Sequence, residues 1–208
     1  MHAAPVLRGG RVARATWLVI GLFLCACGIL AFLESRLGLP PWDVLHQGIA
    51  KHTPLSFGLA NELVAVVILF LAWRLGSRPG IGTVANAALI GGFIVVVQPL
   101  SAVQHLAGWP LPARAALLVL GLVLFGIGSA FYIGAAFGAG PRDSLMLVGA
   151  LRLRVRIGVV RAALEGTALV AGVALGGTVG IGTLVFALLI GPSVEASFWL
   201  VTRLGLTT

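Results

Sequence analysis

Residues 38–45, GLPPWDVL, return 100 positions later as GAGPRDSL, residues 138–145. The two stretches share a glycine, a proline, an aspartate and a leucine at equal spacing and without a gap. A second motif keeps the same offset, because GIGT occurs at 80–83 and again at 180–183. Self-similarity at a fixed offset indicates a repeated structural unit. The sequence therefore predicts two copies of one unit, at about 15–101 and about 115–201, within a single domain covering 1–208.

The composition places these units in a membrane. The 208 residues are 59% hydrophobic and 10% charged, with a mean hydropathy of +1.09, whereas soluble domains carry about 25% charged residues. Membrane helices need about 20 apolar residues. Runs of that length fall near 15–33, 57–75, 81–100, 115–137, 157–175 and 180–201. The sequence thus predicts an all-α membrane protein with six spans, three in each copy, and excludes a separate soluble domain.

The distribution of positive charge predicts the orientation of the spans. Of the 14 Lys and Arg residues, 11 fall in the two tails and in the second and fourth connecting regions. Because positive loops stay inside, both termini are expected in the cytoplasm of a bacterial inner membrane. The net charge of +8 is then an orientation signal and not a nucleic-acid-binding surface. The run from Ala15 to Leu33 is longer than a signal-peptide core, so an uncleaved first helix is expected.

Three spans per copy are an odd number, so the second copy must enter the membrane from the opposite side. The expected arrangement is an inverted-topology repeat, which occurs in many transporters. The loop containing Pro41 and Asp43 would lie outside, and the loop containing Pro141 and Asp143 would lie inside.

Each PxD motif is expected to start a short helix. The proline would end the preceding element, and Asp43 or Asp143 would be the N-cap that accepts backbone N–H groups of the first turn. The preferred interpretation is an amphipathic helix on the membrane surface. The alternative is a re-entrant half-helix whose N-terminus contributes to a polar site.

The GIGT motifs stand where one span ends and the next begins. The first glycine of each motif is expected to adopt positive φ and close the turn, and the threonine is expected to cap or back-bond the new helix. A purely structural turn is the preferred interpretation, and a backbone site lining a cavity is the alternative. The motif residues are Gly80, Gly82, Thr83, Gly180, Gly182 and Thr183.

Polar residues within the predicted spans are candidates for function, because they are costly in a bilayer. Glu165 lies four residues after Arg161, so the two can share one helix face. Glu62 and Glu165 are interpreted equally well as functional groups and as polar contacts between helices. With the motif aspartates, the candidate polar or substrate site comprises Asp43, Asp143, Glu62, Glu165, Arg161, Asn61 and Asn86.

No pair of histidines or cysteines has the spacing of metal ligands. The sequence also contains no nucleophile–base pair, P-loop or dinucleotide fingerprint. We therefore expect no metal, no cofactor, no enzymatic activity and no nucleic-acid partner. The lipid bilayer and an unidentified small molecule are the expected partners. Two GxxxG pairs, beginning at Gly134 and Gly172, favour packing within one chain over a dimer face, which leaves a homo-oligomer open.

Four stretches together resemble the YczE-like proteins, which belong to the YczE/YyaS/YitT group of bacterial integral membrane proteins. They are GLPPWDVLHQG at 38–48, RPGIGT at 78–83, GAGPRDSL at 138–145 and VGIGTLVFALLIGP at 179–192. The resemblance covers about residues 15 to 201. It implies a multi-pass inner-membrane protein and says little about a substrate.

Two hypotheses for the function follow. The inverted repeat, the intramembrane carboxyl groups and the paired PxD helices favour a small-solute transporter or exporter. The scarcity of polar residues in the spans and the basic stretch Arg152–Arg156 favour instead a non-transporting accessory protein that supports the assembly or regulation of a partner.

Overall fold

The computed structural model describes residues 5–77, 79–155 and 157–207, and the side chains at 157, 158 and 161 lie outside the described part. The described chain is helical, with one isolated β-bridge between Leu7 and Thr207. The prediction of an all-α protein is therefore confirmed. The helices are α1 Arg11–Ser35, α2 Pro41–His52, α3 Phe57–Arg74, α4 Ile81–Val97, α5 Ser101–Gln104, the 3-10 helix η1 Leu106–Gly108, α6 Leu111–Gly134, α7 Pro141–Leu153, α8 Ile157–Ala174 and α9 Ile181–Arg203.

Four helices are long and apolar enough to cross a membrane, namely α1, α3, α6 and α9. Helix α4 passes the same test only together with α5 and η1, from which it is bent by 83°. Helix α8 has a shorter apolar stretch, Ala162–Ala174. By length and composition the described helices give four or five spans, and the count of six remains a prediction.

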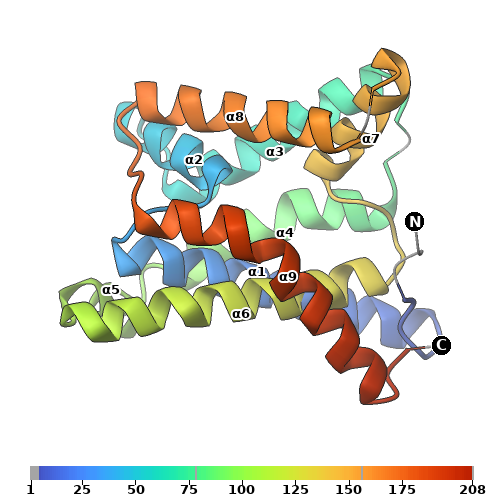
Figure 1. The fold of residues 1–208 in the computed structure, drawn as a ribbon, viewed down its shortest axis with the longest axis horizontal. Coiled ribbons are helices and arrows are strands. Elements are labelled where there is room, and N and C mark those ends of the chain that lie inside the picture. The colour runs from blue at the N-terminus through green and yellow to red at the C-terminus, as the bar shows by residue number, and fades with distance from the viewer. Residues whose placement is uncertain (1–4, 78, 156, 208) are drawn as a thin grey trace.

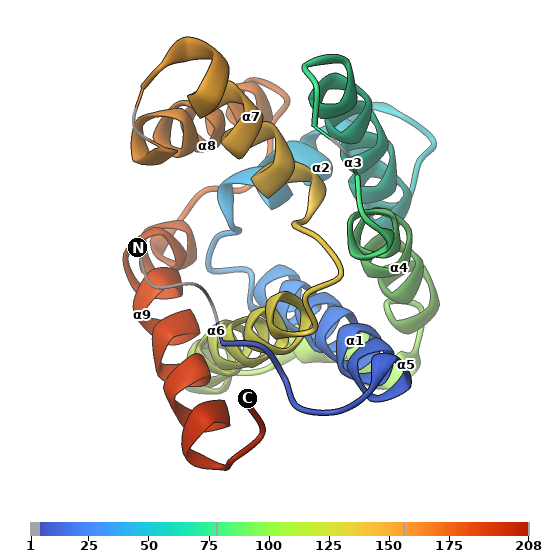
Figure 2. The same ribbon diagram turned by 90° about the vertical axis from the view of Figure 1, so that its right-hand side faces the viewer.

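The helices form two groups (Figures 1 and 2). One group contains α1 and α6 with α9 beside them, the other contains α2, α3, α7 and α8, and α4 packs on both α1 and α3. The closest packing is between α1 and α6, which run antiparallel. A Cβ atom on Gly21 would lie 2.7 Å from the carbonyl oxygen of Gly128, and one on Gly28 would lie 2.8 Å from that of Gly121. Glycine at these positions therefore lets the two backbones touch.

The two sequence copies exchange packing partners, since α2 packs on α8 and α7 packs on α3. The loops before the short helices show the same exchange. The carbonyl of Leu37 accepts a hydrogen bond from the N–H of Gly182 (2.7 Å), and the carbonyl of Phe137 accepts one from the N–H of Gly82 (2.9 Å). The GIGT motif of each copy thus holds the loop that precedes the short helix of the other copy.

The prediction of positive φ at the first glycine of each GIGT motif was wrong. The φ angle is −85° at Gly80 and −172° at Gly180, and the left-handed residues of these connections are Gly76 and Gly176, at 98° and 73°. A side chain at Gly80 or Gly180 is excluded instead by space, because its Cβ would collide with a carbonyl oxygen of the other copy. The threonine hydroxyls of the two motifs accept hydrogen bonds from these glycine N–H groups, at 3.1 and 3.3 Å.

Both short helices begin at the proline of the PxD motif and not at the aspartate. Pro41 and Pro141 are the first residues of α2 and α7, where the missing N–H would have been unpaired in any case. The aspartates therefore stand third, and neither forms an N-cap hydrogen bond. The N-cap prediction was wrong because proline fits the first helical position, which leaves both carboxylates for other contacts.

Helix α2 does not lie on an outer surface of the protein. Its first two turns are buried against α3 and α8, and Asp43 and His46 are 1% and 0% exposed. Figure 1 shows that α2 and α7 run from the middle of the molecule toward opposite ends. The preferred interpretation as a surface helix does not account for this burial.

Candidate functional site

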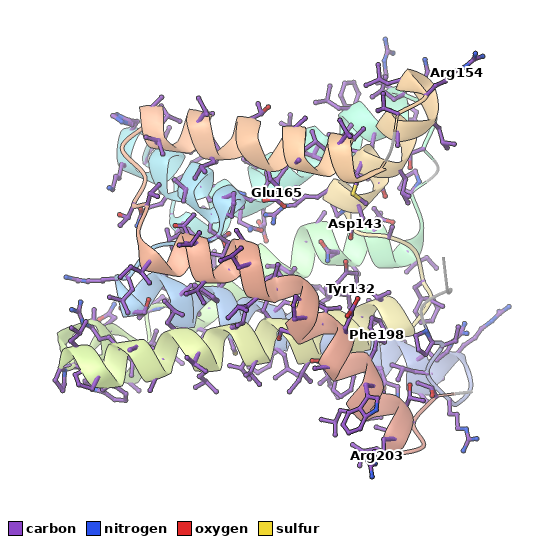
Figure 3. The ribbon with its side chains drawn as sticks, viewed as in Figure 1. Tyr132, Asp143, Arg154, Glu165, Phe198 and Arg203 are labelled. Carbon is purple, nitrogen blue, oxygen red and sulfur yellow. The ribbon has the colours of Figure 1, made fainter. Side chains whose placement is uncertain are left out.

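A cavity of about 270 Å³ lies where the beginnings of α2 and α7 meet the α1–α6 pair. Residues of both sequence copies line it, and its apolar wall includes Trp42, Phe125 and Phe186. Figure 3 shows Tyr132, Asp143 and Glu165 in the middle of the molecule, where they come from α6, α7 and α8. A largely apolar cavity with a few polar groups is typical of small-molecule sites. Its polar lining comprises Asp43, Asn61, Asn86, Ser129, Tyr132, Arg142, Asp143 and Glu165.

The structure brings five of the seven sequence-derived candidates to this cavity. They are Asp43, Asn61, Asn86, Asp143 and Glu165. Glu62 is not at the cavity, because its side chain packs so tightly on α4 that a Cβ atom at Gly91 would collide with it. The side chain of Arg161 lies outside the described part of the chain.

Asp43 is held by His46, one turn further along α2. Oδ1 of Asp43 lies 3.0 Å from Nδ1 of His46, and the amide nitrogen of Asn61 lies 3.2 Å from the same Nδ1. On the other side of the ring, a guanidinium nitrogen of Arg142 lies 3.5 Å from Nε2. A neutral imidazole in which Nδ1–H donates to the carboxylate and Nε2 accepts from Arg142 fits these contacts. The second oxygen of Asp43 has no hydrogen-bond partner among the described residues.

Arg142 and Trp42 are the middle residues of the two PxD motifs, and they stack on each other. The guanidinium carbon of Arg142 lies 4.9 Å from the centroid of the Trp42 ring, within the range of a cation–π interaction. This contact joins the N-terminal turns of α2 and α7 across the cavity. The aromatic wall therefore already accommodates one cation.

Tyr132 is the one tyrosine of the sequence, and its hydroxyl donates a hydrogen bond to Oδ2 of Asp143 at 2.8 Å. Tyr132 is buried and Asp143 is half-buried. In the described part of the chain, Oδ1 of Asp143 has no hydrogen-bond partner. Each motif aspartate thus has one oxygen bound by the protein and one oxygen without a donor among the described residues.

Four residues of this arrangement were not predicted from the sequence, namely Trp42, His46, Tyr132 and Arg142. Two signals could have indicated them. Trp42 and Arg142 occupy the variable position of the duplicated motif, and Tyr132 is a single polar aromatic residue within an apolar run. His46 gave no comparable signal, because no other histidine stands at metal-ligand spacing from it.

The polar groups of the cavity can form hydrogen bonds with a bound solute and interact with its charge. Carboxylates accept, the guanidinium donates, and the amides of Asn61 and Asn86 do both. Within residues 5–77, 79–155 and 157–207, no group of three or more His, Cys, Asp or Glu side chains is placed to hold a metal ion.

One family profile and three known proteins are similar to this chain. The profile of a family of unknown function, DUF6198, matches residues 12–197. An uncharacterized protein of Haemophilus influenzae is 35% identical over 196 residues, which cover 91% of this chain and 88% of that protein. The uncharacterized membrane protein YczE of Bacillus subtilis is 34% identical over 183 residues, covering 86% and 83%. The uncharacterized protein YyaS of the same organism is 28% identical over 193 residues, covering 89% and 96%.

These matches confirm the resemblance to the YczE-like proteins that the motifs predicted. With the apolar helices they support a membrane location. No solved structure matches the chain.

Proposed function

We propose that this chain, which belongs to the family of unknown function DUF6198, is a small-solute transporter of the bacterial inner membrane and not an enzyme. One observation carries the proposal, namely the polar cavity where the N-terminal turns of α2 and α7 meet. Transporters with inverted repeats place the substrate at the interface of the repeats, between the ends of discontinuous helices. In this proposal α2 and α7 are re-entrant half-helices.

Contacts near the middle of the molecule support two inverted repeats at about 15–101 and 115–201. Adding or subtracting 100 positions converts the Gly21–Gly128 contact into the Gly121–Gly28 contact, and both occur. On the same α1–α6 interface, the thiol of Cys25 lies 3.9 Å from the carbonyl oxygen of Phe125, exactly one offset away in sequence. A two-fold axis in the membrane plane, passing near this contact, would relate the two copies.

The positions of the termini support an even number of membrane crossings. Besides the Leu7–Thr207 bridge, the N–H of Arg8 donates to the carbonyl of Leu206 at 2.7 Å, so both tails lie at one end of the molecule. Arg154 and Arg203 lie at the same end (Figure 3). Because positive residues favour the cytoplasmic side, we assign this end to the cytoplasm.

The proposal can be tested without knowing the substrate. We would place one cysteine at the cavity, Asn86→Cys, in a background carrying Cys25→Ala and Cys27→Ala. Right-side-out and inside-out vesicles would be treated with a membrane-impermeant thiol reagent. Because a transporter must expose its site to both sides in turn, labelling is expected from both. The matched control is Leu188→Cys on an exposed apolar position of α9, which should face lipid and resist labelling from either side.

Labelling of Asn86→Cys from one side alone, or from neither side, would contradict transport. It would favour the accessory hypothesis, in which the cavity is a structural feature of a protein that supports a partner.

A further inference from the structure

We infer that the central cavity binds a small organic monocation, an inference that rests on the proposed transport function. It names the chemical class of the solute, which neither the family nor its uncharacterised relatives indicate.

The charge of the cavity wall favours a cation. Among the described lining residues, Asp43, Asp143 and Glu165 contribute three carboxyl groups and Arg142 contributes a guanidinium, and Glu165 has a further interaction of its own. Each helix N-terminus adds the equivalent of about half a positive charge, and α2 and α7 both begin at the cavity. Among the described lining residues the carboxyl groups therefore outnumber the guanidinium, and a bound monocation would meet the two motif carboxylates, Asp43 and Asp143.

Two carboxylate oxygens are placed to receive such a solute. Asp43 is 1% exposed and lines the cavity, and one of its oxygens has no donor among the described residues. Asp143 repeats this arrangement from the opposite short helix, since Tyr132 occupies only one of its oxygens. A ligand carrying positive charge would supply what both carboxylates lack.

The size and the walls of the cavity favour an organic cation over a metal ion. A volume of about 270 Å³ is far larger than a single dehydrated ion needs, and no metal-binding cluster occurs among the described residues. Aromatic rings of Phe125, Tyr132 and Phe186 complete the wall beside Trp42. Aromatic faces bind ammonium groups of organic ligands by cation–π attraction.

Four compounds of nearly equal shape separate the effect of charge from that of size. Choline carries one positive charge, glycine betaine is zwitterionic, 3,3-dimethylbutan-1-ol is neutral and 3,3-dimethylbutanoate is an anion. Each would be added to the Asn86→Cys protein in vesicles, and the slowing of thiol labelling would be measured as protection. Choline is expected to protect at a concentration about tenfold lower than the neutral alcohol, which corresponds to about 1.4 kcal/mol of binding free energy.

Charge-neutralising variants provide the second readout. Asp143→Asn and, as an independent variant, Glu165→Gln should each raise the choline concentration needed for protection by about tenfold. Glu195→Gln makes the same change on an exposed residue outside the lining and should leave protection unchanged. Thermal unfolding of each variant in detergent would identify any that fails to fold.

The outcomes separate this inference from the transport proposal. If the cavity cysteine is labelled from both sides but choline protects no better than the neutral alcohol, the cation inference is wrong and transport stands. Stronger protection by glycine betaine or by the anion would assign another solute class and also overturn the inference. Labelling from one side only would overturn transport itself, whatever the compounds do.

Discussion

Two walls of the cavity are built from equivalent positions of the two copies. The residues at these positions differ between the copies. On one side, Phe32 packs edge-on against Phe186, with ring centroids 5.6 Å apart. The positions 100 residues away from this pair are Tyr132 and Asn86, both of which line the cavity. Tyr132 also donates a hydrogen bond to Asp143. The same backbone plan thus supports an apolar wall in one place and a polar wall in the other.

The apolar wall separates the central cavity from a second one. Phe186 lines the central cavity, whereas its partner Phe32 lines a neighbouring cavity of about 580 Å³. Glu34, Arg36 and Lys51 also line the second cavity, which makes it polar. The glycine contacts between α1 and α6 are therefore equivalent in the two copies, whereas a few side chains differ between the two walls.

The strongest test of this comparison is whether the two copies face opposite ways. Cysteines introduced singly at His52 and Arg154, both exposed ends of the short helices, should be labelled from opposite sides of the membrane. Because α2 and α7 run toward opposite ends of the molecule, the expected result is all-or-none. The control is Val12→Cys, 82% exposed near the N-terminus, which should share the side of Arg154. Labelling of His52 and Arg154 from one side would show that the copies are parallel.

The second test opens the apolar wall. Phe186→Ala removes the ring that packs on Phe32, so a reagent in the second cavity gains a path to the central one. Labelling of Asn86→Cys from the side of His52 should become about tenfold faster, corresponding to a barrier lower by about 1.4 kcal/mol. Phe198→Ala is the matched control, because this phenylalanine of α9 is outside both cavity linings. An unchanged rate would mean that Phe32 and Phe186 do not form the barrier.

The helices could be predicted from the sequence, but the contacts between their side chains could not. The offset of 100 and the apolar runs predicted the helices, because both features are periodic along the chain. They did not predict which side chains meet, since α2 packs on α8 and α7 on α3. Asn61 and Glu62 illustrate the limit, because neighbours on a helix point about 100° apart. Asn61 lines the cavity while Glu62 packs on α4, and only the packing of α3 decides between them.

The third test compares equivalent glycines of the central helix pair. Gly21→Ala places a Cβ 2.7 Å from two backbone atoms of α6, whereas the nearest atoms for Gly121→Ala are Cδ2 of Phe32 at 2.9 Å and the carbonyl oxygen of Gly28 at 3.0 Å. Because the backbone contacts are closer at Gly21 than at Gly121, Gly21→Ala should lower the free energy of unfolding by about 1–3 kcal/mol and Gly121→Ala by less. Denaturation in detergent would measure both.

The control for this pair is Gly191→Ala in α9, where a Cβ would meet nothing within 4 Å. Alanine is the better helix former, so this change should be neutral or stabilising. Equal losses at Gly21 and Gly121 would show that the α1–α6 contact is as unyielding on one side of its centre as on the other.

The smallest effect on stability is expected at the C-terminal ends of α2 and α7, where each short helix is hydrogen-bonded to the other copy. The ammonium group of Lys51, near the end of α2, donates to the carbonyl of Gly176 after α8, and Nε of Arg152, near the end of α7, donates to the carbonyl of Leu75 after α3 at 2.7 Å. Both cations are exposed, so Lys51→Ala and Arg152→Ala should each lower the free energy of unfolding by no more than about 1 kcal/mol.

The double variant of Lys51 and Arg152 should show the sum of the two losses, because the sites share no partner. His52→Ala, at an exposed residue without a side-chain hydrogen bond in the described chain, is the control for α2. A loss in the Arg152 variant alone would extend the inequality of the cavity walls to the ends of the helices. Losses in both would show that the exchange of partners between copies stabilises each end alike, and would confine the inequality to the side chains around the cavity.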